Sequence, residues 1–351
     1  MFLEMMRVLT ILAVLFIVTP LMAQRPTGIK MIHPAGSRNT LQACPPGQGN
    51  DAGTVSFGAF TGQSNDTTLN EIFLCFGDEL LIDHNGDQNL SGDPDPTTQA
   101  GVGYAFYSCP PTVTGEELSL ILNDPCLLDN TTPPPPGGIW IATGGTTSGD
   151  VLFQNDGSIQ NFLFGGDPGE VWFAPITYDA LDPTDSSAIF EAGGGCVNVR
   201  TDEAFSVVYL NPIDTISVET PGCSGSITIT GGLPEYLGNN DYTVTMTSVA
   251  NPLDSAQVNI VGVPGAPELA RIRFSVPQAG LYDVVIEDGK SCGLTIQVDV
   301  PDCAFVTFDL AEEIAAPDST VCVPIYVSDF LDIRSFQFSI HFDNTILEYI
   351  G

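Results

Sequence analysis

Apolar residues recur at every second position in many short runs of this chain, which is the period of half-buried β-strands. The clearest runs lie near the end of the chain, at 321–327 and 336–342. Seven earlier runs are short and rich in Val, Ile, Phe and Tyr: Thr54–Phe60, Glu71–Phe76, Glu79–Asp83, Gly103–Ser108, Gly138–Thr143, Val171–Thr177 and Ala204–Leu210. Because Gly, Pro, Asn and Asp separate these runs, the pattern predicts an all-β protein. Glu116–Leu122 is predicted as a short helix.

A further group of runs lies between Ile213 and Cys303. Ser226–Thr230 and Tyr242–Met246 alternate as strands do, and the glycines and proline at 231–234 predict a turn between them. Three more strands are predicted, at Arg271–Val276, Gly280–Glu287 and Leu294–Val300. Five strands in roughly 90 residues are typical of an immunoglobulin-like sandwich.

The last segment of the chain, 304–351, carries a family resemblance. Residues 318–327, 333–340 and 342–349 resemble the opening strands and the first corner of a cohesin domain, which is a β-sandwich module. The resemblance implies a protein partner, because cohesins as a family bind dockerin modules. Only the first strands of such a domain are present, and a sandwich needs more strands to cover its apolar face. We therefore expect the protein to continue beyond Gly351.

Two other segments resemble bacterial surface proteins. Residues 91–97, 103–109, 172–177 and 205–211 resemble a region of large secreted surface proteins of gliding, polysaccharide-degrading bacteria, which implies no activity. Residues 274–282 and 288–292 resemble the repeat modules of bacterial surface adhesins. Within this module we expect a disulfide between Cys223 and Cys292, tying its first strand to a late one.

The expected organisation follows from these patterns and resemblances. It comprises a signal peptide (1–23), a leader (24–43), an N-terminal β-rich domain (44–212), an immunoglobulin-like domain (213–303) and an incomplete cohesin-like domain (304–351). The predicted fold class is all-β, with tandem β-sandwich domains.

The first 23 residues have the form of a secretory signal peptide. An apolar run from Val8 to Val18 follows Arg7, Pro20 breaks it, and the small residue Ala23 precedes the expected cut. A membrane anchor is the alternative, but the run is shorter than the roughly 20 apolar residues that a spanning helix needs. We therefore expect a secreted, extracellular or cell-surface protein without a membrane span.

Nine cysteines in an exported chain predict disulfides, whose connectivity the spacing does not determine. The odd count fits either a partner beyond Gly351 or a free thiol. Zinc is the competing interpretation, but the chain has no Cys-x-x-Cys pair and only three histidines.

The charge balance is strongly acidic, with 43 Asp and Glu residues against 9 Lys and Arg residues and a net charge of -34. Such a surface disfavours nucleic acid and anionic membranes, and it favours cations. The simpler interpretation is that the acidity keeps a secreted protein soluble.

One loop has the residue pattern of a calcium site. Oxygen-bearing side chains alternate along it, and calcium takes six to eight oxygen ligands; the candidate ligands are Asp83, Asn85, Asp87, Asn89 and Asp93. The loop is not a standard EF-hand, because Gln88 and Pro94 stand at the sixth and twelfth positions. The alternative is a polar turn in which Asn and Asp side chains cap their own backbone.

No catalytic constellation stands out. The three histidines do not fit a nucleophile triad, and a glycosidase needs only two carboxylates, which a chain with 43 acidic residues readily supplies. Five aromatic side chains are either sugar-stacking platforms or core residues: Tyr104, Phe106, Tyr107, Trp172 and Phe173. We expect no enzyme.

The sequence thus predicts an exported modular protein for binding or adhesion at the cell surface. Its expected partner is a protein, dockerin-like or other, or an extracellular polysaccharide. The alternative is a secreted polysaccharide-active enzyme whose catalytic domain is absent from this chain or hidden in 44–212.

Overall fold

The computed structural model describes residues 29–32, 49–64, 71–92, 100–115, 117–128, 139–144, 146–181, 188–189, 197–301, 307–310, 316 and 319–328. The predicted signal peptide, Asp93 and the predicted strand at 336–342 lie outside these residues. The chain forms two compact units. The first comprises 1–212 together with the short segments 231–237 and 288–292, and the second comprises 213–230, 238–287 and 293–351.

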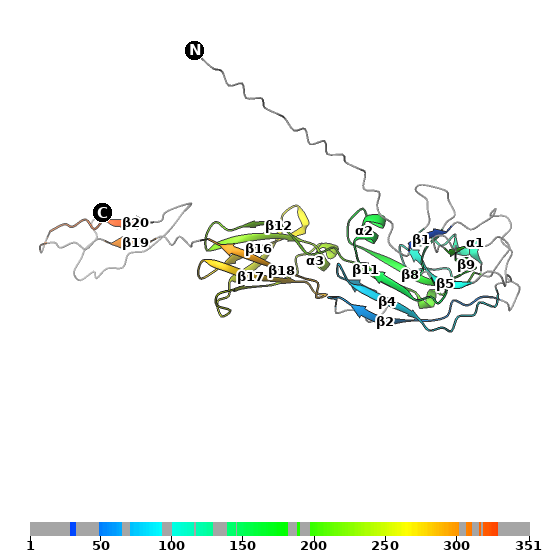
Figure 1. Ribbon diagram of the computed structural model, residues 1–351. Coiled ribbons are helices and arrows are strands. Elements are labelled where there is room, and N and C mark those ends of the chain that lie inside the picture. The colour runs from blue at the N-terminus through cyan, green and yellow to red at the C-terminus, as the bar shows by residue number, and fades with distance from the viewer. Residues whose placement is uncertain are drawn as a thin grey trace, which may run out of the picture. The chain divides into compact units, whose positions relative to one another are not determined.

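The first unit is built on two β-sheets (Figure 1). The larger sheet has the strand order β1 (Ile29–Ile32), β6 (Ile139–Ala142), β5 (Gly101–Tyr107), β8 (Gly169–Tyr178), β11 (Phe205–Tyr209) and β3 (Glu71–Leu74). Its neighbours are antiparallel except β11 and β3, which pair in parallel. The smaller sheet has the order β2 (Val55–Thr61), β4 (Glu79–His84) and β7 (Val151–Gln154).

Short elements connect these strands. They are the helices α1 (Leu118–Ile121) and α2 (Ser158–Leu163), the 3-10 helix η1 (Thr201–Glu203), and the paired strands β9 (Ala180–Leu181) and β10 (Ala188–Ile189).

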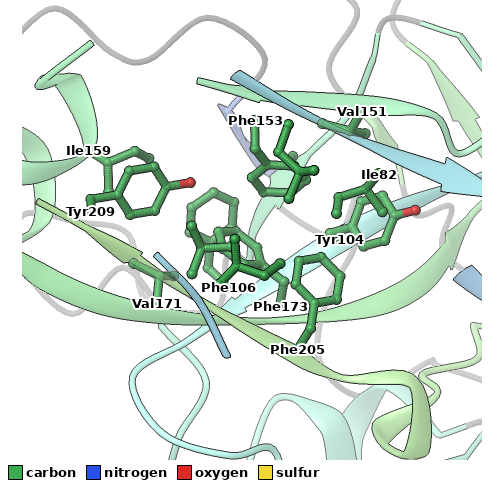
Figure 2. Packing of buried hydrophobic residues seen from close by; sticks show 14 of the residues in the cluster. Ile82, Tyr104, Phe106, Val151, Phe153, Ile159, Val171, Phe173, Phe205 and Tyr209 are labelled. Carbon is green, nitrogen blue, oxygen red and sulfur yellow. The ribbon is translucent and has the colours of Figure 1, made fainter. Parts of the chain in front are cut away.

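An aromatic core fills the space between the two sheets of the first unit (Figure 2). The Phe153 ring of β7 packs edge-on against Phe173 of β8, with 4.7 Å between centroids, and Phe173 stacks on Phe205 at 5.6 Å. Aromatic pairs in these geometries contribute about 0.5–1.5 kcal/mol each beyond the burial of their area. A second cluster, containing Tyr107 and Ile141, covers the other face of the larger sheet together with α1. The larger sheet is therefore buried on both faces.

The second unit contains a sandwich of seven antiparallel strands. One sheet has the order β12 (Asp214–Glu219), β13 (Ser224–Thr230), β16 (Ala266–Ser275) and β15 (Gln257–Val263). The other has the order β14 (Thr243–Ser248), β17 (Gly280–Glu287) and β18 (Gly293–Val300). Ile227, Ile272 and Phe274 of the first sheet, and Tyr282 and Ile286 of the second, are buried. Later in the chain, β19 (Thr307–Leu310) pairs with β20 (Ile325–Ser328).

The all-β prediction is confirmed, and each early strand predicted from a short apolar run corresponds to an observed strand. The predicted turn at 231–234 is wrong. The helix α3 (Gly232–Leu237) occupies this segment, and the strands on either side, β13 and β14, lie in different sheets. Local alternation identifies a strand, but it does not reveal which strand becomes the neighbour.

The predicted disulfide between Cys223 and Cys292 is also wrong. Cys292 bonds Cys75 across 217 residues of sequence, and Cys109 bonds Cys126. Cys223 is itself disulfide-bonded, with a different partner. The reason is positional, because the segment 288–292 belongs to the first unit, where Cys75 follows β3. Cys322 is a free, exposed thiol.

Candidate functional site

The predicted calcium loop forms a tight polar turn after β4. Both carboxylate oxygens of Asp87 accept hydrogen bonds from Thr54, one from its backbone N–H and one from its hydroxyl, each at 2.8 Å. These bonds hold the pKa of Asp87 below its usual range. Asn85 donates to the Thr54 hydroxyl at 2.8 Å, and Asn89 accepts the Ser91 N–H at 3.1 Å. Asp87 and Asn85 therefore tie the turn to Thr54, and Asn89 caps the backbone of the turn itself, as Asn commonly does.

Calcium binding at this loop stays a prediction. Asp83, Asn85, Asp87 and Asn89 are exposed. Within the described ranges no group of three or more His, Cys, Asp and Glu side chains is arranged to hold a metal ion.

A calorimetric titration of the full chain with calcium tests the prediction. The calcium hypothesis requires a heat of binding and a rise in melting temperature, both abolished by Asp87→Asn. A titration with no heat and no shift in melting temperature contradicts the calcium hypothesis and supports the alternative, a polar turn.

Most of the aromatic residues proposed as sugar platforms are core residues. Tyr104, Phe106, Tyr107 and Phe173 have no exposed surface, and Trp172 is half-buried against the cluster around Tyr107. Burial raises the pKa of the Tyr104 and Tyr107 hydroxyls far above their usual value. These rings stabilise the fold and do not present a stacking face to solvent.

A cleft of about 400 Å³ opens between the two sheets of the first unit. Phe106, Phe153 and Ile159 supply an apolar floor, and Leu152, which is 53% exposed, lies at its mouth. The polar lining comes from the ends of β6, β7 and α2: Thr143, Asp150, Gln154, Asp156 and Ser158. A volume of this size, with a largely apolar floor and a few polar groups, is typical of a small-ligand site.

Tyr209 of β11 also lines this cleft and carries an unpartnered hydroxyl. The side chain is 1% exposed, and none of the described residues makes a hydrogen bond to its hydroxyl. Burial raises the pKa of Tyr209, and the nearby Asp156 carboxylate raises it further. Tyr209 therefore stays neutral and keeps its proton for donation. Figure 2 shows its ring beside Ile159.

Two carboxylates at the rim are held in place by backbone donors. Asp150 accepts the N–H of His84 at 3.0 Å, while the His84 ring bonds the Ala52 carbonyl at 2.7 Å. Asp156 accepts the backbone N–H of Ser158 at 2.9 Å and also its hydroxyl. Each of these contacts involves one oxygen of the carboxylate, Oδ1 in both residues, so Oδ2 is left to accept hydrogen bonds from a ligand.

The cleft wall between β6 and β7 is shaped by two backbone segments, at Gly144 and Asp150, that pass close to each other. A Cβ atom at Gly144 would lie 2.0 Å from the Asp150 carbonyl oxygen, so only glycine fits there without moving the chain. This approach positions Asp150 at the rim.

The arrangement suits a ligand that has one apolar face and several hydroxyl groups. Leu152 at the mouth can pack against carbon, the Tyr209 hydroxyl can donate or accept, and the rim carboxylates can accept hydrogen bonds from ligand hydroxyls. Sequence reasoning missed this site. Tyr209 lies inside a predicted strand with nothing to distinguish it from core, and Asp150 and Asp156 are two of 43 acidic residues.

The two units define this chain as a tandem β-sandwich protein. No family model matches it, and no curated protein matches it either. Among solved structures, the Escherichia coli adhesin FdeC aligns over 77% of this chain and 70% of its own, with 11% identity and a TM-score of 0.23. The Parabacteroides merdae β-glucuronidase aligns over 70% of this chain, with 8% identity and a TM-score of 0.18. This chain covers 25% of the glucuronidase.

Because both TM-scores are well below 0.5, neither likeness supports an argument about fold or function. The assignment to tandem sandwiches rests on the sheets. In the part of the chain that the structure describes, no helix is long and apolar enough to cross a membrane.

Proposed function

We propose that this chain is an exported binding protein of the cell surface, and that the cleft of its first unit takes a hydroxyl-rich ligand, the end of a saccharide chain. The observation that carries the proposal is the Tyr209 hydroxyl, which lines the cleft near Asp156 and makes no hydrogen bond to a described residue. A hydrogen bond between this hydroxyl and a ligand hydroxyl would contribute about 0.5–1.5 kcal/mol to binding.

Export is supported by covalent chemistry. Two disulfides cross-link the first unit, and Cys223 is bonded as well. Disulfides persist in oxidising compartments outside the cytosol, which agrees with the signal-peptide pattern of residues 1–23.

The chemistry of the cleft favours a saccharide over a purely apolar ligand. A pyranose ring has one face of C–H groups that can pack on Leu152, which is 53% exposed at the mouth of the cleft, and hydroxyls at its edge that can reach Tyr209 and Asp156. A purely apolar ligand would offer no hydrogen bond to the Tyr209 hydroxyl or to the Oδ2 atoms of the two carboxylates, which is unfavourable. A protein partner that inserts a hydroxyl-bearing side chain is an outcome of the test below.

A glycan array with the full chain identifies the ligand, and calorimetry with the best oligosaccharide measures its affinity. We expect Tyr209→Phe to weaken binding about five- to tenfold, since it removes one hydrogen bond and keeps the ring. Tyr107→Phe is the matched control. Its hydroxyl likewise has no hydrogen-bond partner among the described residues, but it is fully buried and belongs to the cluster on the other face of the larger sheet.

Two outcomes contradict the proposal. The first is silence across the array, and the second is an affinity that Tyr209→Phe and Tyr107→Phe change equally.

The enzyme predicted as the alternative shares this cleft, because Asp150 and Asp156 both line it and glycosidases work with two carboxylates. The binding proposal expects the oligosaccharide to be recovered intact after prolonged incubation. Cleavage products that disappear in Asp150→Asn and Asp156→Asn would instead establish the enzyme.

A further inference from the structure

The second unit carries two arginines side by side on the outer face of its four-stranded sheet. Arg271 and Arg273 lie two residues apart on β16, so both side chains point to the same face, about 7 Å apart along the strand. Both are exposed, whereas Ile272 between them is buried in the sandwich. Neither guanidinium makes an ion pair or a hydrogen bond with any residue that the structure describes.

This lack of partners is unusual for so acidic a chain. With 43 acidic residues and 9 basic ones, most arginines should find a carboxylate, as Arg200 does with Asp51 and Asp202. The strand register explains why the pair does not. Arg273 is flanked by Ser226 and Asn259, and Arg271 by Thr228 and Val261.

The surroundings of the pair are polar and neutral. The next row along the sheet consists of Ser224, Ser275 and Gln257, so hydroxyl and amide groups continue on this face. Glu219 is the acidic residue in the row of Arg273, and it lies two strands away, about 10 Å. The arginine face, defined here as Arg271, Arg273 and these flanking residues, therefore holds positive charge with hydrogen-bonding groups around it.

We infer that the arginine face binds an anionic polysaccharide, through carboxylate or sulfate groups held by the two guanidiniums. An arginine fork bonds both oxygens of such a group, and these charge-assisted bonds are stronger than neutral ones. The neighbouring hydroxyl and amide side chains can then bond the sugar hydroxyls. This site is separate from the cleft of the first unit, lies on another sandwich and does not depend on the proposed function.

A protein partner suits this face less well. Protein interfaces place aromatic and other apolar side chains at their centre. In the rows across the sheet that contain Arg271 and Arg273, the apolar residue is Val261, which is half-buried. A flat polar face with positive charge at its centre fits a polar polyanion better than it fits an acidic protein surface.

The overall charge of -34 opposes any polyanion at long range, but salt limits this repulsion. At about 0.15 M salt the Debye length is about 8 Å, so distant carboxylates are largely screened while direct contacts with the arginines remain. The affinity should therefore rise from very low salt to about 0.1 M and then fall at higher salt.

Biolayer interferometry with the full chain tests the inference, using immobilised polygalacturonate for carboxylate, dextran sulfate for sulfate and dextran as the neutral control. We expect binding to at least one of the anionic polymers and none to dextran. The double variant Arg271→Gln/Arg273→Gln should lose at least about tenfold in affinity, since it removes both charge-assisted contacts.

Thr245→Glu/Thr295→Glu provides a control with matched charge. Both threonines are exposed and flank Val285 on the other sheet, and this variant lowers the net charge by two units, as the arginine variant does. It should keep most of the affinity, and Arg271→Lys/Arg273→Lys, which keeps the charge but not the fork, should retain an intermediate affinity.

Three results would overturn the inference. These are no binding to either anionic polymer, an equal loss in the arginine and threonine variants, and sedimentation that shows a dimer dissolved by the arginine variant without polysaccharide binding. The last result would assign the arginine face to a second copy of the chain. Because Tyr209→Phe leaves the arginine face unchanged, a failure here is distinguishable from a failure of the cleft proposal.

Discussion

Three buried aspartates, Asp78, Asp124 and Asp288, use the same device to hold the loops of the first unit. Each accepts three backbone N–H hydrogen bonds, and in each set one donor is a disulfide-bonded cysteine. The cysteines are Cys75, Cys126 and Cys292. In each loop a carboxylate and a disulfide thus hold the same turn. The aspartate accepts hydrogen bonds from backbone N–H groups that have no partner in a neighbouring strand.

Asp78→Asn tests this device at the most buried of the three sites. The amide replaces one acceptor oxygen with an NH₂ group that faces backbone donors. We expect the free energy of unfolding to fall by about 2 kcal/mol, in the range for hydrogen bonds to charged groups. Urea denaturation followed by tryptophan fluorescence measures it, because the two tryptophans, Trp140 and Trp172, lie in strands of the first unit.

Asp167→Asn is the matched control, since Asp167 is exposed in the same unit and its side chain makes no hydrogen bond to a described residue. Its free energy of unfolding should equal that of the wild type. Equal stability of the Asp78 and Asp167 variants would show that the carboxylate does not hold the loop.

At the scale of elements, disulfides close loops of very different length. Cys75–Cys292 spans 217 residues and Cys109–Cys126 spans 17. In the chain-entropy account a longer loop restricts the unfolded chain more, giving about 5 kcal/mol for the long loop and about 3 kcal/mol for the short one.

Replacing each pair by serine tests this ordering. Cys75→Ser/Cys292→Ser should lower the midpoint of urea denaturation, followed by tryptophan fluorescence, further than Cys109→Ser/Cys126→Ser does. The opposite order would mean that local strain or structure in the unfolded chain outweighs loop entropy.

Strands were predictable where their pattern is local and strong. β5, β8 and β17 alternate or run apolar over eight residues or so, and the sequence predicts each close to its observed bounds. β7 and β12 were not predicted from the sequence. β7 has four residues, and β12 is an edge strand with exposed residues at most positions.

Pairing and the site were not predictable, because both depend on contacts between distant residues. The parallel pairing of β3 with β11 joins segments more than 130 residues apart, and it helps to place Tyr209 in the core. The cleft gathers Phe106, Asp150, Ile159 and Tyr209 from four elements or their ends. Of its members, the sequence singled out only Phe106, as a candidate sugar platform or core residue.

The whole molecule combines two sandwich units with two chemically different surfaces. The first unit offers a cleft with rim carboxylates and the Tyr209 hydroxyl, and the second offers the arginine face. If both proposals hold, the chain binds a saccharide end and an acidic polymer at two different sites. Binding at the two sites should then be separable by substitution, because no side chain is shared between them.

A cross-comparison of variants tests this central claim most directly. The affinity of the full chain is measured for the oligosaccharide from the glycan array and for the anionic polysaccharide, in the wild type, Tyr209→Phe, Arg271→Gln/Arg273→Gln and the triple variant. The account predicts that Tyr209→Phe weakens only the binding of the oligosaccharide and that the arginine variant weakens only the binding of the polyanion. In the triple variant both affinities should fall, each by as much as in the corresponding separate variant. If either variant lowers the affinity for both ligands equally, or if neither variant changes any affinity, the chain does not have two separate binding sites.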